Sequence, residues 1–126
     1  ERVAEAGIPA ALITNASAAN ARAMLEAAPE GALRFAISAD DVSRSKPDPE
    51  PYARAIERLG ADAAASIAFE DSGSGARAAT AAGARLWFLT TQLTASPVPA
   101  ERTIGTLADV DADELFAALG GAVPAT

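Results

Sequence analysis

Cysteine and histidine are absent from this 126-residue sequence, and aromatic residues are scarce. Without cysteine, the chain has neither a disulfide framework nor a thiolate metal site. Without histidine, it lacks the side chain that most often carries protons near neutral pH. Aromatic residues make up 5% of the sequence although hydrophobic residues make up 50%, and much of that half is alanine. We therefore expect a core built from small side chains.

Positive charge is also in short supply, because 10 lysine and arginine residues stand against 17 aspartate and glutamate residues, for a net charge of −7. An acidic surface repels phosphate groups, which argues against nucleic acid and anionic membranes as partners. No apolar run approaches the length of a membrane-spanning helix, and no signal-peptide pattern is present. We expect a soluble, cytoplasmic protein, and the length suits one compact domain.

What the sequence does contain is an alternation of short apolar runs with segments of helical spacing. The apolar runs predict buried strands at 10–13, 35–37, 66–69 and 85–89, with a brief edge strand at 103–104. Helices are predicted at 17–28, 51–59, 73–82 and 111–119, and a helix end at 1–6. Residues 29–31 are expected to end the helix at 17–28. In the helix at 17–28, Ala21, Met24 and Leu25 are expected to form the buried face. This order is typical of an α/β fold, a Rossmann-like parallel sheet with helices on both faces.

Polar residues follow three of the predicted strands. Thr14 and Asn15 follow the first, Ser38 ends the second and leads to Lys46, and Glu70-Asp71 ends the third. Parallel strands end at the same edge of a sheet, which is where open α/β sheets bind ligands. A hydroxyl, an ammonium and two carboxylates at that edge suit a phosphate ester held with Mg²⁺, which prefers hard oxygen ligands.

Each of these features also has a plainer interpretation. Lys46 would ordinarily be a solvated surface lysine, but Pro47 restricts its backbone, and this favours a positioned charge. The acids Glu70-Asp71 would stabilise a helix N-terminus, but two adjacent carboxylates after a buried strand favour metal binding. The run Gly73-Ser74-Gly75 resembles a dinucleotide loop but has Ala78 in place of the third glycine, so a tight turn is favoured.

The stretches ALITN, SKPDPEPY and FEDSGSGARAATAAG, in this order and spacing, resemble the haloacid dehalogenase superfamily of phosphatases and phosphomutases. The nearest subgroup is that of phosphoglycolate phosphatase and β-phosphoglucomutase. The resemblance implies a partial core domain at 1–120 followed by a tail at 121–126. By this resemblance Thr14 would bind the transferring phosphoryl group and Asn15 would offer its backbone N–H and amide nearby. Lys46 would neutralise the nucleophile and the phosphoryl oxygens, and Asp71 with Glu70 would hold Mg²⁺.

The sequence departs from the family pattern in one respect. The family has an Asp-x-Asp pair, the nucleophile and the general acid/base, at the end of a central strand that is followed by a helical cap domain. No such strand precedes Thr14, and the pairs within 109–113 come too late in the chain. The first residue is Glu1, and Met24 is the only methionine. The resemblance therefore implies the carboxyl-terminal part of the core domain, without its central strand and cap.

Three hypotheses follow. The first is part of a Mg²⁺-dependent phosphatase or phosphomutase that acts on a small phosphate monoester, of the sugar phosphate or phosphoglycolate class, through an aspartyl-phosphate. The isolated chain would then be marginally stable and inactive. The second is a non-catalytic fragment or interaction module completed by a partner that supplies the missing strand. A phospho-acceptor receiver domain ranks last, because its acceptor Asp would have to precede the threonine.

Overall fold

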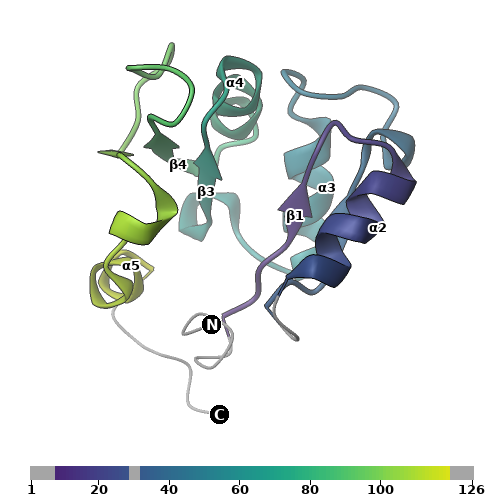
Figure 1. Cartoon of the computed structure of the whole chain (residues 1–126), viewed down its shortest axis with the longest axis horizontal. Helices are drawn as coiled ribbons and strands as arrows, with labels where there is room; N and C mark the ends of the chain where they lie inside the picture. Colours follow the sequence, from purple (N-terminus) through teal and green to yellow (C-terminus); the bar gives the residue numbers. More distant parts are fainter. Residues whose placement is uncertain (1–7, 29–31, 120–126) are drawn as a thin grey trace.

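The computed structural model describes residues 8–28 and 32–119, in which strands and helices alternate (Figure 1). The predicted α/β class is confirmed. The predicted helix end at 1–6, the end of the first full helix at 29–31, the boundary at residue 120 and the tail at 121–126 lie outside the described residues. The elements are β1 (Leu12–Ile13), α2 (Ala18–Ala27), β2 (Ala36–Ile37), α3 (Glu50–Leu59), β3 (Ile67–Glu70), α4 (Gly73–Ala81), β4 (Arg85–Leu89), β5 (Arg102–Ile104) and α5 (Ala112–Ala118), with 3-10 turns η1 (Ala39–Asp41), η2 (Ala63–Ala65) and η3 (Leu107–Asp109).

The strands form two separate parallel sheets rather than one. In the smaller sheet β1 pairs with β2, so that Ile13 lies opposite Ile37. In the larger sheet β4 lies between β3 and β5. In Figure 1 the arrows of β1 and β3 point the same way, yet no backbone ladder joins them within 8–28 and 32–119. This division between the two sheets, at β1 and β3, falls where the family resemblance implies a missing strand.

Side-chain caps and glycines set the helix ends. Ser17 accepts a hydrogen bond from the Asn20 N–H at the start of α2, and Ser72 does the same for the Gly75 N–H at the start of α4. Helix α3 ends at Gly60, whose φ of 67° is in the left-handed region that glycine adopts without strain. None of the helices in the described part of the chain is long and apolar enough to cross a membrane.

Alanines allow α4 to lie close against the larger sheet. Ala76, Ala78 and Ala79 are each 0% exposed. Ala76 packs with Phe88 of β4, whereas Ala78 and Ala79 pack with Ala68 of β3. Such close packing of small helical residues on the strands gives the dense interior that folded domains require. The expected alanine-rich core is therefore confirmed.

The prediction of one core residue is wrong. Met24 was expected on the buried face of α2, but it is 48% exposed, and Ala21 is the buried residue of that helix. The physical reason is the width of the sheet, since α2 lies on a sheet of two short strands, which covers a narrow stripe of the helix.

Candidate functional site at the strand ends

The ammonium of Lys46 joins the two sheets at the carboxyl ends of β1 and β3. Its Nζ donates to the Ile13 carbonyl oxygen at 3.2 Å and to Glu70 Oε2 at 3.1 Å. The Lys46 side chain is 10% exposed and that of Glu70 is 7% exposed. A buried ion pair of this kind needs further hydrogen bonds to offset the loss of water, and the Ile13 carbonyl supplies one. Lys46 is thus a positioned charge rather than a solvated surface lysine.

The amide of Asn15 holds the backbone of the proline-rich loop. The Lys46 N–H donates to Asn15 Oδ1 at 3.2 Å, and Asn15 Nδ2 donates to the Lys46 carbonyl oxygen at 3.5 Å. The Lys46–Pro47 peptide bond is cis. These contacts place Asn15 at the site through its side-chain amide. Its predicted contact with a phosphoryl group stays a prediction.

Thr14 follows directly on the residue whose carbonyl accepts from Lys46. Its N–H donates to the Ile37 carbonyl oxygen at 2.9 Å, which fixes its backbone at the end of the smaller sheet. Its Oγ1 accepts from the Ala16 N–H at 3.0 Å. Because this contact uses the hydroxyl as an acceptor, its O–H can still be donated to a ligand.

The carboxylate of Glu70 has a second donor that sequence reasoning missed. The hydroxyl of Tyr52, in the first turn of α3, donates a short hydrogen bond to the same Oε2 that accepts from Lys46. Burial, and after it the negative charge of Glu70, raises the pKa of Tyr52 well above its ordinary value, so the phenol stays a neutral donor. The spacing of apolar residues predicted only a buried position. The available signal was the hydroxyl itself, since a buried tyrosine usually needs a polar partner.

Asp71 is held by a different part of the chain. Its Oδ2 accepts from Thr91 Oγ1 at 2.9 Å and from Gln92 Nε2 at 3.3 Å. Both residues lie in the loop after β4, which the sequence marks only as polar and proline-bearing. No local pattern singles them out, so their contact with Asp71 was visible only in three dimensions.

Glu70 and Asp71 fit a magnesium ion in ligand type. They are oxygen donors at the end of one strand, and Oε1 of Glu70 lies at Gly75, where a side chain would overlap it. No cluster of three or more acidic side chains that could hold a metal occurs within 8–28 and 32–119. A magnesium ion is commonly held by one or two protein carboxylates, with phosphate oxygens and water completing its shell.

Ser38, which the sequence places among the strand-end polar residues, does not contribute its hydroxyl to this site. That hydroxyl donates to Asp41 Oδ2 at 3.0 Å, and the Ser38 N–H donates to the same oxygen at 2.8 Å. The hydrogen bond from the backbone N–H is the main reason that the pKa of Asp41 is lowered. Ser38 therefore stabilises the turn after β2.

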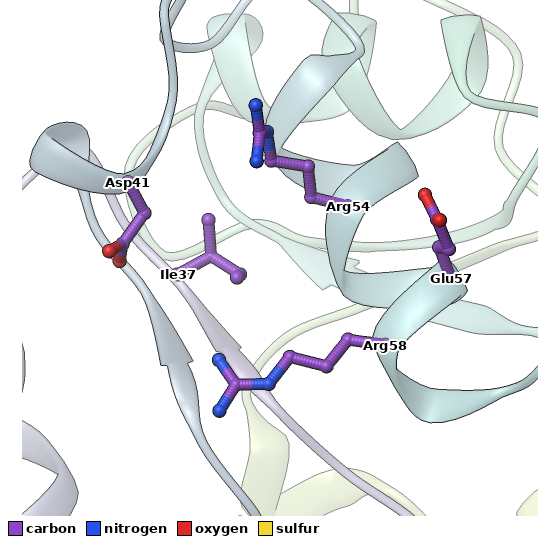
Figure 2. A pocket seen from close by; sticks show the side chains of 5 residues that line it. All are labelled: Ile37, Asp41, Arg54, Glu57 and Arg58. Atoms are coloured by element: carbon purple, nitrogen blue, oxygen red, sulfur yellow. The ribbon is translucent and has the colours of Figure 1, made fainter.

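A cavity of about 450 Å³ lies at β2, η1 and α3, and none of Thr14, Lys46, Glu70 and Asp71 lines it (Figure 2). Arg54 and Arg58 line it, but so do Asp41 and Glu57. Both arginines are already engaged, because Arg54 pairs with Glu50 at 2.9 Å and Arg58 lies over the Phe35 ring at 4.2 Å. The charges that line the cavity are of both signs and are partly paired within the protein. We therefore place the candidate functional site at the strand ends and not at this cavity.

Comparison with known proteins identifies a matching family and several relatives. The family model described as haloacid dehalogenase-like hydrolase matches residues 1–83. The chain is 43% identical over 83 residues to protein CbbY, plasmid, of Cupriavidus necator, covering 63% of this chain and 33% of that protein. It is 49% identical over 51 residues to validoxylamine A 7'-phosphate phosphatase of Streptomyces hygroscopicus subsp. limoneus, covering 40% of this chain and 24% of that protein.

A solved structure resembles this chain over a larger share of its length than the curated relatives do. A mutant CbbY from Rhodobacter sphaeroides, in complex with xylulose-(1,5)bisphosphate, matches with a TM-score of 0.74 and 29% identity. The match covers 85% of this chain and 50% of that one. The chain thus spans about a third of the length of the curated CbbY relative and half the length of the solved one.

Proposed function

Because the chain belongs to the haloacid dehalogenase-like hydrolase family, we propose that it forms part of a Mg²⁺-dependent phosphatase or phosphomutase. The proposed substrate is a small phosphate monoester of the sugar phosphate class. Two relatives support this class, since one is named for its action on validoxylamine A 7'-phosphate and one is solved with xylulose-(1,5)bisphosphate. The proposed protein is soluble and cytoplasmic, with residues 1–120 as part of its core domain.

The observation that carries the proposal is the position of Lys46. An ammonium group can donate three hydrogen bonds, and its described contacts use two, to Ile13 and Glu70. The third is available to a phosphoryl oxygen at the end of β1. There the Thr14 hydroxyl and the Asn15 backbone N–H would donate to the same group. Such fixed donors stabilise the charge that develops on a transferring phosphoryl group.

Asp71 and Glu70 would hold the metal beside these donors. A bound Mg²⁺ supplies positive charge that neutralises the phosphoryl oxygens. Thr91 and Gln92 hold Oδ2 of Asp71, and its Oδ1, which has no hydrogen-bond partner among the described residues, would face the metal. Lys46 and Tyr52 donate to Oε2 of Glu70, so Oε1 is the oxygen of Glu70 that would bind the metal.

The nucleophile would come from a strand outside these residues, which we propose lies between β1 and β3. Its first Asp carboxylate would attack phosphorus and form an aspartyl-phosphate, while the second Asp would protonate the leaving ester oxygen. Water or a sugar hydroxyl, deprotonated by the second Asp, would then attack phosphorus and release the first Asp. Without that strand, the 126-residue chain is expected to be inactive.

A second candidate function rests on the same division of the sheet. The edges of β1 and β3 that face the division carry no ladder to each other within the described residues. Unpaired strand edges accept a strand from another chain. A non-catalytic module completed by a partner's strand would use this edge pairing alone, without Mg²⁺ and without phosphate chemistry.

The proposal is tested by measuring the phosphatase kinetics of a fusion protein. The fusion adds an Asp-x-Asp strand and a cap domain before residue 1. We expect Mg²⁺-dependent phosphatase activity that falls by at least about a hundredfold in both Lys46→Ala and Asp71→Asn. Asp62→Asn, at the start of the turn η2 that precedes β3, is the matched control and should keep the activity. Near-normal activity in either site variant would refute the assigned roles, and strand binding without activity would favour the interaction module.

A further inference from the structure

We infer that Tyr52 is a positioning residue of the proposed site, acting on the metal through Glu70. This inference rests on the proposed function. The hydroxyl of Tyr52 donates to Glu70 Oε2, and the Lys46 ammonium donates to the same oxygen at 3.1 Å. With both donors on Oε2, the other oxygen, Oε1, is the one left for a ligand. The hydroxyl thereby selects which oxygen of Glu70 is presented.

The carboxylate is held in this orientation from both ends. On one side Oε2 is fixed by the two donors, and on the other Oε1 occupies the space that a Cβ on Gly75 would fill. Glu70 is 7% exposed, so water does not readily replace either donor. A carboxylate in this setting loses its fixed direction when one of the two donors is removed.

Tyr52 is itself rigidly placed. The residue is 5% exposed and packs with Ala68, Ala78 and Ala79. It lies in the first turn of α3 directly after Pro51, a residue that favours helix starts. The hydroxyl therefore cannot follow the carboxylate if Glu70 moves, which is what a positioning group requires.

Packing alone does not account for the hydroxyl. Phenylalanine would fill the same space between α3 and α4 without burying a polar oxygen, which is costly unless it finds a partner. Among the described residues, the hydrogen-bond partner of this hydroxyl is not a backbone carbonyl of the core. The hydroxyl reaches the carboxylate that also binds Lys46, and this is the reason to assign it a role in the site.

Metal binding by the whole 126-residue chain tests the inference. Mn²⁺, which reports its own binding by electron paramagnetic resonance, stands in for Mg²⁺. We expect Asp71→Asn to abolish binding and Tyr52→Phe to raise the Kd about tenfold, the usual size of an effect transmitted through a ligand's partner. Ser66→Ala, which removes a hydroxyl at the opposite end of β3, should change the Kd by less than about twofold.

The outcomes separate the two levels of the argument. A Kd for Tyr52→Phe within about twofold of the original, with binding still lost in Asp71→Asn, overturns the role of Tyr52 alone. Absence of binding in the original chain, or equal binding in Asp71→Asn, overturns the metal assignment and the inference with it. The fluorescence of Trp87 reports whether each variant keeps its core.

A second measurement needs no substitution. Tyr52 is the only tyrosine, so a chain labelled with ¹³Cζ-tyrosine gives one ring signal. If the hydroxyl acts on the metal site through Glu70, added Mg²⁺ shifts that signal with the same saturation as metal binding. A signal that does not move while Mg²⁺ binds contradicts the inference, even if Tyr52→Phe fails to fold.

Discussion

Lys46 is the only lysine in the chain, and its surroundings suit function better than stability. Its ion pair with Glu70 is almost entirely buried. Replacing such a pair by apolar residues is often neutral or stabilising, whereas removing one partner costs about 3–5 kcal/mol. A charge that is expensive to bury and is held by a carbonyl and a carboxylate at a strand end is best explained by a ligand that uses its remaining donor.

Gly75 provides a residue-scale prediction. A Cβ at this position would overlap the Glu70 carboxylate, which is itself buried. We expect Gly75→Ala to displace Glu70 from Lys46 and Tyr52. Thermal unfolding should show a loss of about 1–3 kcal/mol, typical of an overpacked core position.

Gly73→Ala in the same helix is the control, because the nearest atom to its new Cβ would be Pro97 Cγ at an ordinary 3.6 Å. Equal stability of the two variants would show that the Glu70 carboxylate is not confined as described.

Residue types with a distinctive local setting were predictable from the sequence. Lys46 stands among prolines, and Glu70-Asp71 follows an apolar run, so each is marked by its neighbours in the chain. Tyr52, Thr91 and Gln92 lack such a setting. They touch the acids only because α3 and the loop after β4 fold back on the end of β3, and that proximity is a property of the tertiary structure.

At the element scale, the hydrogen bonds of Arg85 link β4, β5 and α5. Arg85 begins β4 and donates to the Glu101 carboxylate at 2.7–3.1 Å. It also donates to the Ala118 carbonyl oxygen at the end of α5. The Trp87 indole N–H donates to the same Glu101 carboxylate at 2.8 Å. The edge strand β5, which is short and exposed, is held to the sheet partly through these side chains.

These contacts give a pH dependence. Hydrogen bonds from Arg85, and after them from Trp87, hold the pKa of Glu101 below its ordinary value of 4.5. A lowered folded-state pKa means that the stabilisation is fully present above pH 4.5 and is lost as the pH falls through the folded value. We expect Glu101→Gln to be less stable than the original near pH 6 and to lose less stability towards pH 3.

Thermal melting followed by Trp87 fluorescence between pH 6 and pH 3 measures this difference. Glu26→Gln, on the exposed helix α2, should leave the pH dependence unchanged. An identical pH dependence for Glu101→Gln and the original chain would mean that the contacts of Glu101 do not contribute to stability.

The ends of a strand were predicted better where the strand pairs with a neighbour on each side. The strand predicted at 85–89 matches β4 at both ends, since β4 pairs on both sides. The strands predicted at 10–13 and 35–37 are shorter in the structure, because within the described part of the chain β1 and β2 form a ladder only with each other. The prediction for Met24 was wrong because the sheet under α2 is narrow. The spacing of apolar residues predicts which face of a helix is apolar, but not how much of that face the sheet covers.

At the scale of the whole molecule, the two sheets are held together by side chains rather than by a backbone ladder. Ile13 of the smaller sheet packs with Tyr52 and Ala68, and Lys46 reaches across to Glu70. The family resemblance predicted a gap in the sheet, but the sequence did not predict whether β1 and β3 would close it. They do not pair within the described residues, and the proposed site lies at the end of this division.

Complementation with a peptide tests this account most directly. A peptide that carries an Asp-x-Asp strand is added to the purified chain, and phosphate release from a sugar phosphate is measured with and without Mg²⁺. The account predicts no activity for either component alone, and Mg²⁺-dependent activity for the mixture that is lost with Asp71→Asn. Turnover by the chain alone, or activity of the mixture that survives Asp71→Asn, would contradict it.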